Sequence, residues 1–155
     1  MAALAQNNEG TTARLESMQL PVSGKWMGQA RDAALTRLHD MGLPSRRDEY
    51  WKFTRPDTLI QETAPEAAVF DSGEAPLFDE FDRLKIVFVD GVFDPEQSDT
   101  LDGENLSIER LSDVANKDIH WVRDLYGVLE NTGQTPVSRP LAAMNTAFAC
   151  DGVVI

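Results

Sequence analysis

Apolar residues recur at helical spacing between Lys25 and Met41, and this pattern predicts an amphipathic helix over that range. The stripe consists of Met27, Ala30, Ala34, Leu38 and Met41. Ser23 is a suitable N-cap residue in front of the helix. Gly42 and Pro44 follow it, as is typical of a helix end, because glycine accepts a positive φ and proline cannot extend a helix.

Shorter helices are predicted on either side of this one. Ala13–Leu20 has room for one or two turns before Pro21 ends it. A second short helix over Ser45–Phe53 would be capped by its first serine, with Asp48 in the capping-box position. Pro56 is suited to the first position of a further turn.

Alternation and β-branched residues predict strands in the middle of the chain. Arg83–Val89 is the clearest, and Asp90-Gly91 after it is a pair favoured in two-residue hairpin turns. Val92-Phe93 would then begin the return strand, and Leu106–Leu111 is a weaker strand pattern. We therefore expect one hairpin and one further, weaker strand.

The last third of the chain again shows helical patterns. Trp121–Leu129 places Trp121, Leu125, Val128 and Leu129 on one side of a predicted helix, which Gly133 and Pro136 interrupt. Pro140–Phe148 reads as a helix with proline at its first position.

The chain closes on a predicted strand, Val153–Ile155, after the turn residues Asp151-Gly152. No residues follow that could pair with this strand, and a strand needs partners. We therefore expect the sequence to be truncated within a longer protein.

The elements together predict an α+β fold: N-terminal helices, then short strands and a hairpin, ending at the first strand of a missing β-helix. We divide the chain into a flexible tail (1–24), a helical region (25–62), an acidic linker (63–82), a mixed strand and helix region (83–139) and the start of a truncated β-helix core (140–155).

Charge is unevenly distributed over the 155 residues, whose net charge is −12. Residues 25–55 carry seven basic and four acidic side chains, whereas residues 56–118 carry four basic and seventeen acidic ones. Phosphate would be repelled, so no nucleic-acid partner is expected. The acidic middle is interpreted either as a solvated surface or as a docking surface.

No recognisable site for catalysis, metal or cofactor emerges from the sequence. It contains neither a phosphate-binding glycine loop nor a Cys-x-x-Cys pair, and His39 and His120 fall on different elements. A calcium loop starting at Asp94 fails because Pro95 occupies a loop position and no glycine stands sixth. Cys150, the single cysteine, is interpreted as structural or incidental, because its acidic neighbour Asp151 disfavours a reactive thiolate; a cluster or persulfide role is the alternative.

Membrane and secretory signals are also missing from the sequence. No apolar run approaches the roughly 20 residues that span a bilayer, and the N-terminal residues lack a basic start followed by an apolar stretch. We therefore expect a cytoplasmic protein with no membrane partner.

Two segments carry a resemblance to a known family. The first is the run from Gly42 to Thr54, which resembles a G-L-P-x-R-x-E-x-W-K-[YF]-T signature. The residues that agree are Gly42, Leu43, Pro44, Arg46 or Arg47, Glu49, Trp51, Lys52, Phe53 and Thr54. The second is Pro140–Phe148 followed by Asp151-Gly152 and Val153–Ile155, similar to a P-[FL]-x-A-[LM]-N-x-A-F segment that precedes D-G-[VA]-x-[IV]. Together they resemble the SufB/SufD family of iron–sulfur cluster assembly proteins, and within it the SufD branch.

The resemblance implies a scaffold subunit rather than an enzyme. SufD-type members pair with SufB-like proteins through β-helices and bind a SufC-like ATPase, and the complete complex assembles the iron–sulfur cluster. The family's cluster-related residues would follow Ile155, so no catalytic, cofactor-binding or metal residue is assigned here. The family-motif positions, with a structural or partner-contact role, are Gly42, Pro44, Arg46, Arg47, Glu49, Trp51, Lys52, Thr54 and Asn145.

Other interpretations remain open at this point. The motif around Trp51 is either a packed helical corner or a partner-contact surface, because tryptophan and arginine often dominate interfaces. The chain as a whole is alternatively a free-standing acidic module that binds a basic partner. A small enzyme of unknown chemistry is a third hypothesis, because spatial clustering is invisible in a sequence.

Overall fold

The computed structural model describes residues 10–45, 48–63, 77–78, 80–89, 91–101, 106–132 and 137–155. Residues 10–16 are helical. The further elements are α2 (Lys25–Met41), η1 (Glu49–Trp51), β1 (Phe88–Val89), β2 (Val92–Phe93), β3 (Glu109–Arg110), α3 (Leu111–Val114), η2 (Trp121–Asp124), α4 (Val128–Thr132), α5 (Pro140–Phe148) and β4 (Val153–Val154). This confirms the α+β class.

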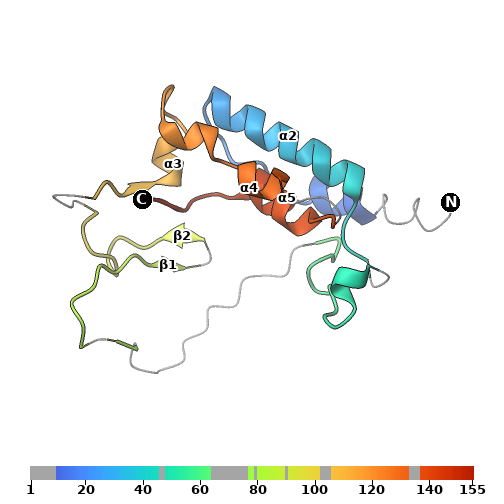
Figure 1. Cartoon of the computed structure of the whole chain (residues 1–155), viewed down its shortest axis with the longest axis horizontal. Helices are drawn as coiled ribbons and strands as arrows, with labels where there is room; N and C mark the ends of the chain where they lie inside the picture. The colour runs from blue at the N-terminus through green and yellow to red at the C-terminus, as the bar shows by residue number, and fades with distance from the viewer. Residues whose placement is uncertain are drawn as a thin grey trace.

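The two longest described helices, α2 and α5, pack against each other, and Figure 1 shows α2 along one side of the molecule with α5 beneath it. Both begin and end at the predicted residues. Their bounds follow from local signals: Gly42 ends α2 with a φ of 68°, and Pro140 stands in the first turn of α5. Local sequence therefore determines the helices on which the remaining elements pack.

The start of α2 differs from the prediction. Gly24, not Ser23, is the N-cap residue, and no side chain caps the helix. The Gly24 amide donates to the carbonyl of Ala115 at 3.0 Å, and a Cβ on Gly24 would lie 2.7 Å from that oxygen. Only glycine allows this close approach, so the tertiary contact decides which residue caps the helix.

Two hydrophobic clusters lie along α2. Trp26 and Met27, near the start of α2, pack with a first cluster that also holds Leu111, Val114, Ala115, Val122 and Val154. Leu38, near its end, packs with a second cluster that holds Leu15, Leu43, Ala143 and Met144. Leu15 comes from helical residues 10–16, so the described part of the predicted tail packs into the core.

The predicted helix over Trp121–Leu129 is wrong as a single element. The segment forms η2 and α4, separated at Gly127, whose φ is 74°. The four apolar residues predicted for one side are exposed, Leu129 at 85%, whereas Val122 is buried. Tyr126, between the two helices, meets the ring of Trp26 edge-on at 6.1 Å between centroids.

The strands form two small antiparallel sheets. β1 pairs with β2 as predicted, with Phe88 opposite Phe93, although both strands are shorter than the pattern suggested. β3 pairs with β4, with Glu109 opposite Val154. The expectation that Val153–Ile155 has no partner in this chain is therefore wrong for Val153 and Val154. β3 supplies that partner because α3, which follows it, is held in the same cluster as Val154.

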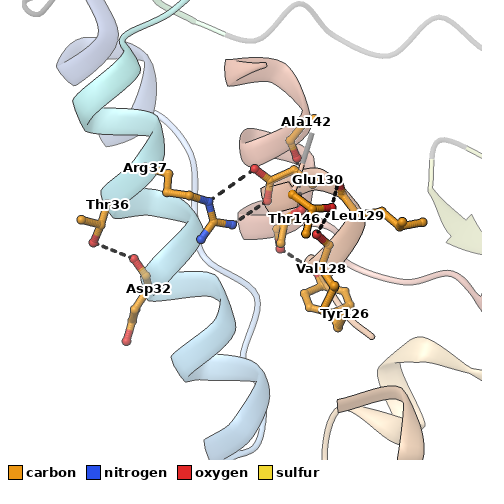
Figure 2. Close-up of polar contacts among 10 residues, drawn as sticks. Asp32, Thr36, Arg37, Tyr126, Val128, Leu129, Glu130, Ala142 and Thr146 are labelled. Carbon is orange, nitrogen blue, oxygen red and sulfur yellow. Dashed lines mark hydrogen bonds and ion pairs between the residues drawn. The ribbon is translucent and has the colours of Figure 1, made fainter. Parts of the chain in front are cut away.

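Polar contacts join the C-terminal half of α2 to α4 (Figure 2). Arg37 on α2 donates to both carboxylate oxygens of Glu130, at 3.4 Å from Nε and 2.5 Å from Nη2. Behind this pair, the Tyr126 hydroxyl donates to the carbonyl of Thr146 on α5 at 2.6 Å. Burial raises the pKa of Tyr126, so the phenol stays protonated and keeps donating.

None of the described helices is long and apolar enough to cross a membrane.

Candidate functional site

The first half of the Gly42–Thr54 motif is a buried elbow. Gly42 donates its backbone N–H to the carbonyl of Leu38 at 2.8 Å, and Leu43 donates to the Thr11 hydroxyl at 3.0 Å. Pro44 is among the fully buried side chains. Three buried groups and two hydrogen bonds fix the direction in which the chain leaves α2, so this half of the motif serves the fold.

The second half of the motif is a short exposed turn. The Ser45 amide donates to a carboxylate oxygen of Asp48 at 2.8 Å, and Asp48 donates its amide to the Ser45 carbonyl at 3.1 Å. The predicted helix over Ser45–Phe53 is wrong: the only helical residues in its described part are those of η1. The Asp48 carboxylate makes the contact predicted for the capping-box position, because it accepts from the Ser45 amide, but no side chain caps η1. Arg46 and Arg47 lie outside the described residues.

Aromatic side chains project from this turn into solvent. Tyr50 is 65% exposed and Phe53 is 93% exposed, while Trp51 between them is half-buried. The Lys52 ammonium stands 5.5 Å from the centre of the Phe53 ring. Glu49 and Thr54 are exposed as well. We call Tyr50–Phe53 the aromatic turn. An exposed cluster of aromatic and charged side chains on a fixed support is suited to contact with another protein.

The two resembling segments meet in the structure. Leu43, from the elbow, shares a hydrophobic cluster with Ala143 and Met144 of α5, about a hundred residues further along the chain. Asn145, the motif position on α5, is exposed between buried neighbours. The structure thus brings the Gly42 and Pro44 elbow to α5, and it leaves Asn145 on the surface.

The structure contains three polar clusters that the sequence did not predict. Arg31 is buried at 3% exposure and donates to the carbonyl oxygens of Pro21 and Ala149. Arg110 binds the Asp151 carboxylate, which also accepts from the amides of Ser112 and Gly152 at 3.1 and 2.9 Å. No sequence signal marked these contacts, because each joins positions that are distant in the chain or placed on a face that reads as polar.

The third cluster surrounds His120. Its Nδ1 accepts from the Val122 amide at 3.2 Å, which makes His120 the N-cap of η2, and its Nε2 lies 3.0 Å from a Glu109 oxygen. The side-chain hydrogen bond from Lys117 is the main cause that lowers the pKa of Glu109, and His120 adds to it. The contacts of His120 with Glu109 and Val122 link β3 to η2, so His120 has a structural role.

The geometry provides no metal or cofactor cage in the described part of the chain. No group of three metal-binding side chains occurs there. Asp94, the first residue of the rejected calcium loop, accepts from the amides of Glu96 and Gln97 at 3.0 and 3.1 Å and from the Gln97 side chain at 2.7 Å. Its oxygens therefore serve a local turn. Cys150 is exposed, with its sulfur 3.6 Å from the Phe148 carbonyl.

No protein-family model, curated protein or solved structure matches this chain.

Proposed function

We propose that this chain is a non-catalytic, cytoplasmic scaffold segment of the SufD type, which works in iron–sulfur cluster assembly with SufB-like and SufC-like proteins. It binds no cofactor itself, and the complete complex assembles the cluster. The observation that carries the proposal is the joint packing of the two resembling segments through Leu43, Ala143 and Met144. Two motifs far apart in sequence that build one cluster belong to one structural unit.

The aromatic turn supports a role in assembly rather than in catalysis. Its support is buried, whereas Tyr50 and Phe53 expose large apolar surfaces to water. Burial of such rings against a partner is favourable, at about 25 cal/mol per Å² of apolar surface removed from water. The proposed mechanism is that the elbow holds the turn in a fixed orientation and the rings enter the interface with the neighbouring subunit.

Co-purification tests the proposal directly. The protein is co-expressed with SufB-like and SufC-like subunits, and both are expected to be recovered with it. Recovery of neither subunit would count against the scaffold assignment.

Two substitutions test the aromatic turn within that experiment. Tyr50→Ala and Phe53→Ala are expected to leave the melting temperature unchanged and to reduce recovery of the neighbouring subunit. Val22→Ala is the matched control, because Val22 is a 97% exposed apolar residue outside the motif. Equal recovery with all three variants would show that the turn lies outside the interface.

A further inference from the structure

The hairpin β1–β2 lies at the edge of the molecule. Figure 1 shows it beside the segment that leads to the C-terminus, with β2 toward the body and β1 on the outside. The Arg110 guanidinium of β3 stacks over the Phe93 ring of β2 at 4.8 Å, which is the contact that ties the hairpin to the second sheet. β2 therefore lies on the side of the hairpin that faces the rest of the protein, and β1 provides the outer edge of the hairpin.

The chain that leads into β1 uses its odd-numbered residues for hydrogen bonds across the hairpin. Lys85 donates its amide to the Asp99 carboxylate at 2.6 Å and accepts from the Asp99 amide at 2.8 Å. Val87 donates to the Ser98 hydroxyl at 2.8 Å and accepts from the Asp94 amide at 2.9 Å. Residues 85–87 are therefore extended and held from one side only.

The even-numbered residues of the same segment consequently direct their backbone groups outward, since these groups alternate along an extended strand. In the described chain, no hydrogen bond outside the β1–β2 ladder reaches the backbone of Leu84, Ile86 or Phe88. Phe88 and Phe93 lie opposite each other as a non-hydrogen-bonded pair, because the neighbouring residues Val87 and Asp94 form the hydrogen-bonded pair. The result is an open edge over residues 84–88.

The side chains along this edge are apolar. Leu84 is 48% exposed, and Ile86 and Phe88 are half-buried. The Phe88 and Phe93 rings meet edge-on at 5.6 Å, so residues of even number share one face with Phe93. A two-stranded ribbon is marginally stable in water, and a third strand would bury this face further.

The sequence segment that contains the edge is strongly acidic. Residues 77–101 contain seven acidic and two basic side chains. In the described part, Glu80, Asp82 and Glu96 form no ion pair. A second copy of the chain would bring the same negative charge to the same edge and would be repelled. The chemistry that complements the edge is an extended segment with alternating apolar and basic residues.

We propose that residues 84–88 form a docking edge for a basic, extended segment of another protein, which binds by strand addition to β1. The partner's backbone would bond to Leu84, Ile86 and Phe88, as in other strand-addition complexes, and its lysine or arginine side chains would meet the surrounding carboxylates. This gives the acidic-module hypothesis a defined site, and it does not depend on the scaffold proposal.

Amide hydrogen exchange measured by NMR on the whole chain tests the docking edge. The probe is a short acetylated and amidated peptide of alternating lysine and valine, with a glutamate and valine peptide as its control. The lysine peptide is expected to slow exchange at the amides of Leu84, Ile86 and Phe88 by about tenfold or more. Exchange at Val87 should change little, because that amide is already bonded within the hairpin.

Two variants separate strand addition from general attraction of charge. Ile86→Pro removes the outward N–H and should weaken peptide binding by about tenfold or more, whereas Ile86→Ala should retain most of it. Protection of Val87 in the proline variant shows that the hairpin is still formed. Glu80→Gln with Asp82→Asn should weaken binding about threefold to tenfold at low salt.

Three results would overturn the proposal. These are no binding of the lysine peptide, binding without protection of the three amides, and protection of the same amides by self-association of the chain without peptide. Each is distinguishable from failure of the co-purification experiment, because none involves SufB-like or SufC-like subunits.

Discussion

Arg31 is a charged residue whose side chain is buried. It lies on the buried side of α2, where Nη2 donates to the Ala149 carbonyl at 2.8 Å and Nη1 donates to the Pro21 carbonyl. Its guanidinium thus ties the segment before α2 to the segment after α5. A planar fork can reach two carbonyl groups that a lysine ammonium cannot serve together.

We predict that Arg31→Met lowers the free energy of unfolding by about 2 to 4 kcal/mol, because two partly buried carbonyl oxygens lose a charged donor. Urea titration followed by tryptophan fluorescence measures the change. Arg123→Met is the control, since the Arg123 side chain is 51% exposed and, among the described residues, forms an ion pair with its neighbour Asp124 alone, at 3.2 Å. A loss of similar size in both variants would contradict the role given to Arg31.

Asp151 is held as a carboxylate by several donors. Its burial alone would raise the pKa, but the Arg110 guanidinium and the amides of Ser112 and Gly152 together keep the pKa below the ordinary value. A depressed pKa in the folded state means that the stabilisation is present above the unfolded pKa of about 3.9. It is lost as the pH falls through the lower, folded value.

We predict that Asp151→Asn destabilises the protein by about 1 to 3 kcal/mol at pH 7, the range for hydrogen bonds to charged groups. The difference from the wild-type chain should shrink as the pH falls below about 4 and through the lower, folded pKa of Asp151, because protonation removes the same charge. Unfolding curves collected over this pH range measure it. A difference that stays constant with pH would exclude the carboxylate as the cause.

At the scale of elements, Gly127 divides the segment that was predicted as one helix into two short helices, η2 and α4. Its φ of 74° ends one helical piece, and a Cβ would lie 3.0 Å from the Thr146 methyl group on α5. Because of this break, the four apolar residues predicted for one side of the helix are exposed to solvent. Val122 is buried instead, and Tyr126 packs against the first hydrophobic cluster.

We predict that Gly127→Ala costs about 1 to 2 kcal/mol, because a side chain disfavours this left-handed conformation. Gly28→Ala is the matched control: Gly28 lies within α2, and a Cβ there would meet nothing within 4 Å. Alanine at position 28 should stabilise the protein by up to about 1 kcal/mol. Thermal unfolding of both variants measures the contrast, and equal shifts would contradict the role assigned to Gly127.

At the scale of the whole molecule, the excess of acidic groups governs the choice of partner. The net charge of −12 opposes approach to phosphate, whereas it favours approach to a basic protein segment. Both proposals made above use protein partners, one through the aromatic turn and one through the edge of β1.

We predict that fluorescein-labelled duplex DNA shows no change in anisotropy at about 150 mM salt when the chain is added to ~100 µM, a level at which ordinary non-specific binders associate. An acidic chain releases few counterions from the DNA phosphates, so the electrostatic free energy that drives non-specific DNA binding is missing. A salt-dependent rise in anisotropy would show that the basic residues between Lys25 and Arg55 form a separate surface.

Local signals were sufficient for α2, for α5 and for the hairpin turn. Lys25–Met41 and Pro140–Phe148 carry their own period, and each has a glycine or proline at one boundary, so their bounds depend little on the rest of the chain. Asp90-Gly91 similarly predicted the turn between β1 and β2, and Gly91 has a φ of 77°.

Long-range contacts decided the remainder. The partner of Val153 and Val154 is β3, more than forty residues earlier, and the N-cap of α2 is determined by the approach of Ala115. The sequence by itself therefore determined where α2, α5 and the hairpin turn form, because those depend on neighbouring residues. The tertiary structure alone decided which apolar side chains are buried, which strand pairs with which and where Arg31 finds its acceptors, because these depend on residues that meet only after folding.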